Sequence, residues 1–217
     1  MFIKICCISS IKEAAMAISR GAAAIGLVSE MPSGPGVIDD ELIREISKFA
    51  EGKADTFLLT SRQNSADIIS QLSRFNTTAV QIVDELLEGT YQDIRNEFGK
   101  TDIVQVIHVE DEKSVENAVR ISEQVDVLLL DSGSPDQKIK ELGGTGRTHN
   151  WELSRRIVEN VKKPVYLAGG LNSENVCDAI RLVKPYGVDV CSGVRTNDKL
   201  DEIKLKSFVN NVSQCVF

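Results

Sequence analysis

The feature that most limits how this chain can fold is a regular alternation of short apolar segments with amphipathic ones along its whole length. The apolar segments are rich in β-branched residues and have the length of strands, whereas the amphipathic segments repeat their apolar residues at helical spacing. Neither a Pro/Ser-rich linker nor a low-complexity tract interrupts the series, so it reads as consecutive strand-helix units. The strands are expected to begin near Phe2, Ala23, Ala54, Thr78, Asp102, Val125, Pro164 and Gly187, and the helices to span 11–20, 39–50, 65–75, 90–99, 112–124, 150–161, 173–183 and 201–212.

The arrangement of these units follows from how apolar the strands are. Segments such as AIGLVS and VDVLLL are apolar throughout, as parallel strands covered by helices on both faces usually are. Eight units in a row favour a closed barrel over an open doubly wound sheet, which usually has fewer strands and a glycine-rich turn after the first one; MFIKICCISS contains no glycine. The sequence therefore predicts an α/β fold, a single-domain (β/α)8 TIM barrel over residues 1–217.

Charge and hydropathy narrow the classes of partner. The net charge of -7 argues against a nucleic-acid or anionic-membrane partner, because either would need clustered Lys and Arg. No apolar run approaches the roughly 20 residues of a membrane span, and the first ten residues lack the features of a secretory leader. We expect a cytoplasmic protein with a small-molecule substrate, and the patterns do not predict an oligomeric state.

The cysteines and histidines limit the possible chemistry further. The five cysteines form an odd number without a CxxC pair, so free thiols are expected rather than a disulfide framework or a zinc site. With only two histidines, no metal centre is expected. His108 ends the fifth strand and is expected to be a hydrogen-bonded structural residue, and Cys177 and Cys191 are expected to pack in the core.

Two intervals between strands are longer than the others and point to the functional end of the barrel. Strand starts are otherwise spaced by roughly 21 to 25 residues. The extra length falls in 29–40 and 131–150, which in a barrel are loops at the carboxyl ends of the strands, where active sites are built. Asp131 ends the sixth strand at this rim, where poor hydration raises a carboxyl pKa and suits a general acid. Its position alone leaves open a helix-cap or salt-bridge role.

Cys6 holds a similar position at the end of the first strand. Alternation in FIKICC places Phe2, Lys4 and Cys6 on one face and Cys7 on the other, so Cys7 is expected to pack outward against a helix. A thiol at the rim can act as a base only as a thiolate, and a lone cysteine is more often a small core residue. The strand pattern by itself leaves both roles open for Cys6.

Glycines after the last two strands predict a phosphate site. In YLAGGLNSENV, two glycines precede a helix that Asn172 or Ser173 is expected to cap, and such a helix start offers free N–H groups to an anion. DVCSGVR supplies the equivalent turn after the eighth strand, and barrels usually bind phosphate at these two turns. The predicted phosphate-binding residues are Gly169, Gly170, Ser192 and Gly193.

Taken in order, these motifs resemble the phosphoribosylanthranilate isomerase family of tryptophan biosynthesis. KICCIS is similar to the family's first-strand motif KICGIT, and LLLDS, GGTGRT, PVYLAGGLNSENV and GVDVCSGV resemble the motifs of its sixth, seventh and eighth strands and sixth loop. The resemblance spans essentially the whole chain, strongly over 125–194 and weakly over 50–100. It implies a cofactor-free Amadori rearrangement of a small phosphorylated substrate, in which an aldose-amine becomes a 1-amino-2-ketose.

The resemblance also implies roles for individual residues. Asp131 would be the general acid that opens the sugar ring, and Cys6 the general base that removes the proton from C2. Asp189 would help to hold the aminoaryl end of the substrate. Thr145 and Gly146, together with Gly144, would belong to a sixth loop that contacts the substrate.

Three positions depart from the family pattern. Gly36 replaces an arginine that lies near the substrate carboxylate, Val83 replaces a usual histidine, and Arg195 stands where the family commonly has glutamate. One hypothesis is that Arg195 substitutes for the lost arginine and binds a substrate carboxylate. The other is that Arg195 is a solvated surface residue that pairs with Asp189 or Asp198.

Two further functions compete with the isomerase. Gly36 and Val83 suggest a paralogue that isomerises a different phosphorylated aminosugar. A phosphosugar-binding protein without turnover is the third possibility, and the presence of both Cys6 and Asp131 counts against it. Cys7 stands where the family has glycine.

Overall fold

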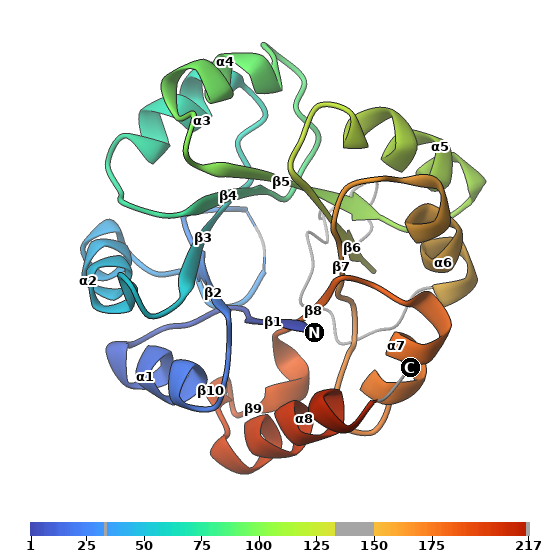
Figure 1. Ribbon diagram of the computed structural model, residues 1–217. Helices are drawn as coiled ribbons and strands as arrows, with labels where there is room; N and C mark the ends of the chain where they lie inside the picture. Colours follow the sequence, from blue (N-terminus) through green and yellow to red (C-terminus); the bar gives the residue numbers. More distant parts are fainter. Residues whose placement is uncertain (33, 133–149, 216–217) are drawn as a thin grey trace.

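Eight parallel strands close on themselves in the computed structural model, which describes residues 1–32, 34–132 and 150–215. They follow one another around the barrel in chain order, and β8 pairs with β1, with Lys4 opposite Asp189 (Figure 1). The predicted (β/α)8 barrel is thereby confirmed. The strands are β1 (Phe2–Ile5), β2 (Ala24–Val28), β3 (Asp55–Thr60), β4 (Ala79–Ile82), β5 (Asp102–His108), β6 (Val127–Asp131), β7 (Val165–Leu167) and β8 (Gly187–Val190).

Helices surround the barrel and begin at polar caps. At all but one of them a side chain accepts a hydrogen bond from a backbone N–H two or three residues later, which satisfies a donor that the first turn leaves free. The helices are α1 (Ile11–Ser19), α2 (Asp40–Ala50), α3 (Ser65–Leu72), α4 (Tyr91–Glu97), α5 (Glu112–Ser122), α6 (Trp151–Asn160), α7 (Val176–Val183) and α8 (Glu202–Gln214). None of these described helices has both the length and the hydropathy needed to cross a membrane.

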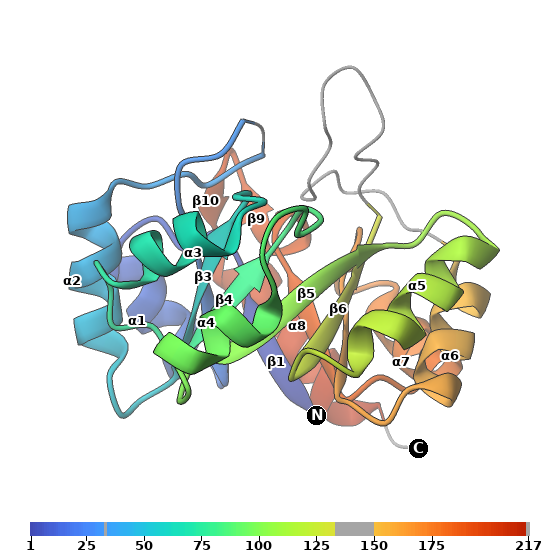
Figure 2. The same cartoon turned by 90° about the horizontal axis from the view of Figure 1, so that it is seen from above.

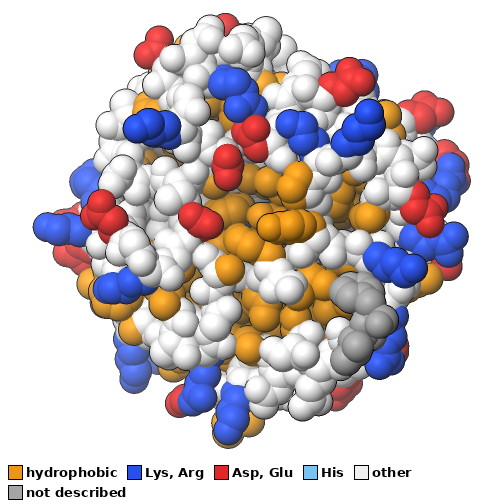
Figure 3. All heavy atoms as spheres, viewed as in Figure 1, with side chains coloured by type: hydrophobic (Ala, Val, Ile, Leu, Met, Phe, Trp, Pro, Cys, Tyr) orange, Lys and Arg blue, Asp and Glu red, His pale blue; other side chains and the backbone are white. Residues whose placement is uncertain are grey.

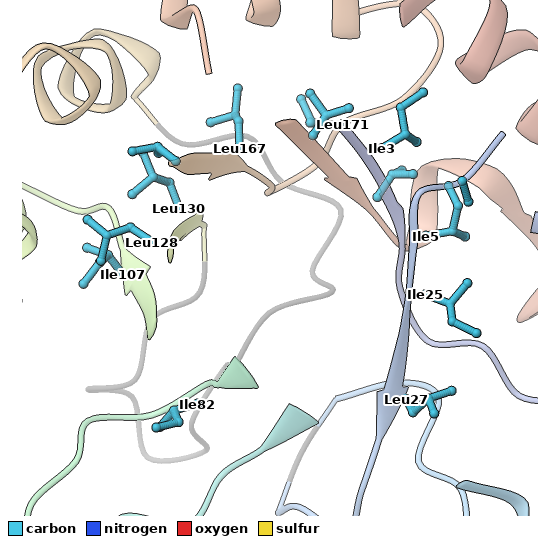
Figure 4. Packing of buried hydrophobic residues seen from close by; sticks show 14 of the residues in the cluster. Ile3, Ile5, Ile25, Leu27, Ile82, Ile107, Leu128, Leu130, Leu167 and Leu171 are labelled. Carbon is cyan, nitrogen blue, oxygen red and sulfur yellow. The ribbon is translucent and has the colours of Figure 1, made fainter. Parts of the chain in front are cut away.

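Alternation along the strands divides the apolar residues into two sets. Outward-facing side chains fill the space between strands and helices, as Figure 4 shows for Ile25, Leu128 and Leu167 among others. The inward-facing set fills the barrel itself and comprises Cys6, Cys7, Ala24, Val28, Phe57, Leu59, Ala79, Val83, Val104, Val106, Val127, Leu129, Tyr166 and Ala168. The barrel is therefore a packed core rather than a channel, and only its ends are available for a site.

The two ends of the barrel differ. The end where the strands begin carries the N-terminus, and it presents hydrophobic side chains at its centre and charged side chains of both signs mainly toward the rim (Figures 1 and 3). The opposite end carries the loops that follow the strands, among them 29–38 after β2 (Figure 2). A short 3-10 helix, η1 (Ser192–Val194), and the hairpin of β9 (Arg195–Thr196) and β10 (Lys199–Leu200) follow β8.

The expectation that all cysteines are free thiols is wrong for two of them. Cys177 in α7 and Cys215 at the end of α8 form a disulfide, with their Cα atoms 5.5 Å apart. The pairing depends on α7 and α8 packing side by side, which brings together residues separated by 38 positions. The spacing of cysteines along the sequence does not predict this contact, because it depends on how the two helices pack.

Candidate active site

A pocket at the carboxyl ends of the strands brings together most of the predicted site residues. It is open to solvent, and its wall combines apolar side chains with a few polar ones, as small-molecule sites usually do. The predicted residues in its wall are Cys6, Asp131, Gly169, Gly170, Asp189 and Ser192. Within the described residues no group of three or more His, Cys, Asp or Glu side chains is placed to hold a metal ion.

Cys6 continues the line of β1 and faces into the barrel. Its N–H donates to the carbonyl oxygen of Val190, and its side chain is 5% exposed. A β-carbon placed at Gly26 on β2 would lie 2.8 Å from the Cys6 sulfur and 3.2 Å from the Nζ of Lys4. Glycine at position 26 is therefore what leaves room for both groups beside each other.

Lys4 is a site residue that the sequence analysis did not single out. It is fully buried, and its Nζ lies 2.9 Å from the carboxylate of Asp189, its partner across β1 and β8. Burial is the largest single influence and opposes the charged ammonium, but the Asp189 carboxylate and the neighbouring Cys6 and Cys7 together outweigh it, so the pKa of Lys4 is raised. The sequence offered one signal that could have identified Lys4, namely a charged residue on the inward face of an otherwise apolar strand.

The pKa of Cys6 is lowered from its usual value. The first cause is a hydrogen bond from Cys7; burial opposes the shift, and the positive charge of Lys4 supports it. The thiolate that base chemistry needs is thus favoured by two neighbours on the same stretch of chain.

Cys7 faces the pocket, which corrects the prediction that it packs outward. Its φ of 62° is left-handed, so the alternation of β1 ends there and the side chain turns inward. Cys191, expected in the core, also lines the pocket, and its thiol donates to the Cys7 sulfur at 2.8 Å.

Asp131 ends β6 with a carboxyl group that is nearly buried. Burial raises its pKa, while the N–H of Ser132, 2.7 Å away, and the nearby His108 oppose part of the shift. The direction is the one that a general acid needs. His108 pairs with Asp131 across the strands, and its Nε2 donates to the carbonyl oxygen of Val83 at 3.0 Å, as expected of a structural histidine.

Gly169 and Gly170 of the predicted phosphate site lie in the pocket wall, whereas the predicted helix start is wrong. Gly169 and Gly170 have φ values of 79° and 62°, and their N–H groups donate to no other group within the described part of the chain. The helix α7 begins at Val176 rather than near position 173. In the turn before it, the side-chain oxygen of Asn172 accepts from the N–H groups of Glu174 and Asn175.

Gly193 lies outside the pocket wall as the described residues define it. A β-carbon there would collide with the carbonyl oxygen of Leu171. This glycine is required where the turn after β8 packs against the turn after β7.

Both hypotheses for Arg195 are corrected. Its side chain is 8% exposed and lies 3.2 Å from the carboxylate of Glu13 in α1, so it is neither solvated nor paired with Asp189. It does contact Asp198, but through the backbone carbonyl oxygen, to which the guanidinium donates at 3.1 Å. The guanidinium also donates to the carbonyl oxygens of Cys6 and Cys7. Arg195 therefore holds the end of β1 in place through these two hydrogen bonds. Its positive charge is balanced by the carboxylate of Glu13.

The structure links two of the departures from the family pattern. Gly36 has a φ of 78°, and a β-carbon built on it would lie 2.5 Å from the β-carbon of Cys7. The side chain that replaces the family's glycine at position 7 thus occupies the space beside position 36. An arginine at 36 is incompatible with Cys7 in this arrangement.

The remaining polar residue of the wall is Gln81 on β4, which the sequence analysis also missed. It is 3% exposed, and its side-chain oxygen has no hydrogen-bond partner among the described residues. Val83 lines the pocket two residues later. Thr145 and Gly146, with Gly144, lie outside the described residues.

Comparison with known proteins places the chain in a family. The family model for N-(5'phosphoribosyl)anthranilate (PRA) isomerase matches residues 3–211. N-(5'-phosphoribosyl)anthranilate isomerase 2 of Methanosarcina mazei is 33% identical over 219 residues, covering 100% of this chain and 96% of the relative. The solved structure of phosphoribosyl anthranilate isomerase from Thermotoga maritima has a TM-score of 0.82 at 28% identity and covers 98% of each chain. Another solved isomerase, in complex with reduced 1-(o-carboxyphenylamino)-1-deoxyribulose 5-phosphate, has a TM-score of 0.79 at 27% identity, with 98% of each chain covered.

The match covers nearly the whole chain, the relatives are similar over their full length, and the solved members share the closed barrel. The chain belongs to the N-(5'-phosphoribosyl)anthranilate isomerase family.

Proposed function

We propose that Asp131 and Cys6 are the acid and the base with which this chain isomerises N-(5'-phosphoribosyl)anthranilate, the reaction for which its family is named. One observation carries the proposal. The ends of β1 and β6 hold a thiol of lowered pKa and a carboxyl group of raised pKa in the wall of one pocket. A reaction that needs an unprotonated base and a protonated acid at once is served by this pair of shifts.

The reaction begins with two proton transfers, one from the acid and one to the base. Asp131 donates its proton to the ring oxygen of the furanose, the C1–O bond breaks, and the ring opens to a protonated Schiff base. The Cys6 thiolate then removes the proton from C2, and the electron pair moves toward the nitrogen to give an enolamine. The enolamine tautomerises to the 1-amino-2-ketose, so the route uses no redox cofactor.

Other residues of the wall suit the two ends of this substrate. The N–H groups of Gly169 and Gly170 are available to phosphate oxygens, and the Ser192 hydroxyl lies in the adjoining turn. At the other end, Asp189 and the unpartnered oxygen of Gln81 can accept hydrogen bonds from the amine or from sugar hydroxyls. These contacts support a small phosphorylated substrate.

The test is an activity assay with matched variants. Substrate fluorescence is followed after phosphoribosylanthranilate is generated in place, with Cys6→Ser and Asp131→Asn beside the unchanged protein. Each substitution is expected to lower kcat by about 10²-fold or more, because each removes a proton-transfer group.

The matched control is Asp126→Asn, which makes the same change just before β6 begins, at the other end of the barrel, where Asp126 binds Arg95. Its folded protein is expected to keep its activity. Turnover that survives Cys6→Ser would remove the base from the mechanism, and no turnover by the unchanged protein would reject the function.

A further inference from the structure

We infer that Cys7 and Cys191 are an oxidation site: a peroxide converts the pair into a reversible disulfide in the wall of the pocket. This inference goes beyond the proposed function and does not depend on it, because the bond itself is what forms and what is measured.

The two thiols are held together by the barrel. Cys7 follows β1 and Cys191 follows β8, and these neighbouring strands are paired up to Ile5 and Val190. Their sulfur atoms lie 2.8 Å apart, so they need to approach by less than about 1 Å to reach a bond length of about 2.05 Å. Neither belongs to the disulfide between Cys177 and Cys215.

Access and protonation decide which sulfur reacts first. Both residues line the solvent-connected pocket, but Cys191 is partly exposed whereas Cys7 is 5% exposed. The contact with Cys191, the contact with Cys6 and burial all raise the pKa of Cys7 well above its usual value, which keeps it a thiol. Of the two, Cys191 is therefore the sulfur that meets the oxidant.

The chemistry balances with a peroxide as the oxidant. The Cys191 thiol gives up its proton and its sulfur attacks one peroxide oxygen; the O–O bond breaks, and the leaving hydroxide takes up that proton as water, so that a sulfenic acid remains. The Cys7 sulfur then attacks the Cys191 sulfur, the S–O bond breaks, and the proton of Cys7 leaves with the hydroxide as water. In total, two thiols and one hydrogen peroxide give one disulfide and two water molecules, and two electrons pass from sulfur to oxygen.

Cys6, although adjacent to Cys7, is not the expected partner. The Cα atoms of consecutive residues joined by a trans peptide are about 3.8 Å apart, which is shorter than the roughly 4.4–6.8 Å that disulfides usually span. Oxidation at the pair is therefore expected to leave Cys6 as a free thiol.

The experiment maps the bond directly. Protein with its three free thiols is treated with one equivalent of hydrogen peroxide, alkylated and digested without reduction. We expect a linked peptide joining Cys7 to Cys191, two hydrogens lighter than the separate peptides, a thiol count that falls from three to one, and full reversal by dithiothreitol.

Two variants sharpen the result. The near-isosteric Cys191→Ser is expected to lose the linked peptide, whereas Cys215→Ser, which breaks the other disulfide, is expected to keep it. The inference is overturned if all three thiols remain alkylatable after treatment, or if Cys6 alone is oxidised. A disulfide from Cys7 that persists in Cys191→Ser overturns it equally.

Discussion

At the scale of single residues, the site depends on what lowers the pKa of the buried Cys6 thiol. Lys4 lies two positions before Cys6 on the same face of β1 and carries a positive charge with no exposure to solvent. In such an environment a nearby cation acts strongly on an ionisable group, because water does not screen it. Asp189 holds the ammonium in place and balances its charge.

Replacing Lys4 tests this arrangement. We expect Lys4→Met to raise the pKa of Cys6, because the thiolate loses its neighbouring cation. A base works only when deprotonated, so activity is gained as the pH rises through this pKa, and the ascending limb of the pH-rate profile moves to higher pH. The direct measurement is the rate of Cys6 alkylation by iodoacetamide against pH, read by mass spectrometry.

The control for this experiment is Lys4→Arg, which keeps the charge and is expected to leave the alkylation profile close to that of the unchanged protein. Both variants are assayed at a temperature at which circular dichroism shows them to be folded. An alkylation profile that is the same in Lys4→Met and in the unchanged protein would assign the lowered pKa to Cys7 alone.

At the scale of elements, contacts between neighbouring loops decide which side chain each can carry. The end of β1 is held from one side by Arg195, which joins it to Glu13 in α1, and Glu13 also accepts from the N–H of Leu200 in β10. From the other side the loop after β2 presents Gly36 to Cys7. A changed side chain in one of these segments therefore alters the space available to its neighbour.

A double-mutant cycle measures the energetic coupling between Gly36, in the loop after β2, and Cys7, which follows β1. Gly36→Ala is expected to destabilise the protein, because the new methyl group meets the Cys7 side chain and the left-handed backbone is strained. In a Cys7→Gly background the clash is relieved, so we expect a coupling energy of about 1 kcal/mol from urea unfolding.

The matched control is Gly34→Ala, at a φ of 111° where a β-carbon would approach only Met31, at 3.8 Å. It shares the backbone strain but not the clash, so it is expected to show no coupling with Cys7→Gly. Equal coupling for both glycines would attribute the effect to loop conformation alone.

At the scale of the whole molecule, the last two helices are joined covalently. The disulfide between Cys177 and Cys215 closes a loop of chain across α7 and α8. Closing such a loop reduces the freedom of the unfolded chain and so favours the folded state.

Removing this disulfide is expected to lower the free energy of unfolding by about 2–4 kcal/mol. The comparison is between Cys177→Ser/Cys215→Ser and the unchanged protein in urea, without a reducing agent. The unchanged protein measured in dithiothreitol provides the control and is expected to unfold at the midpoint of the double variant. Identical midpoints for the oxidised protein and the double variant would contradict the prediction.

The order of elements followed from the sequence because it depends on local information. Strand and helix periodicities and the count of units predicted the closed barrel, and helix starts fell within a residue of expectation apart from α7. The same reasoning brought Cys6, Asp131 and the glycines at 169 and 170 to one end of the barrel, because parallel strands all finish there.

The tertiary structure alone decided the features that depend on distances between remote segments. The left-handed backbone at Cys7 turns its side chain into the pocket, and the pairing of β1 with β8 places Lys4 opposite Asp189. Arg195 forms its ion pair with Glu13, and the packing of α7 against α8 brings Cys177 to Cys215. Periodicity determines which face of an element a side chain occupies, whereas the partner on that face is determined only when the barrel closes.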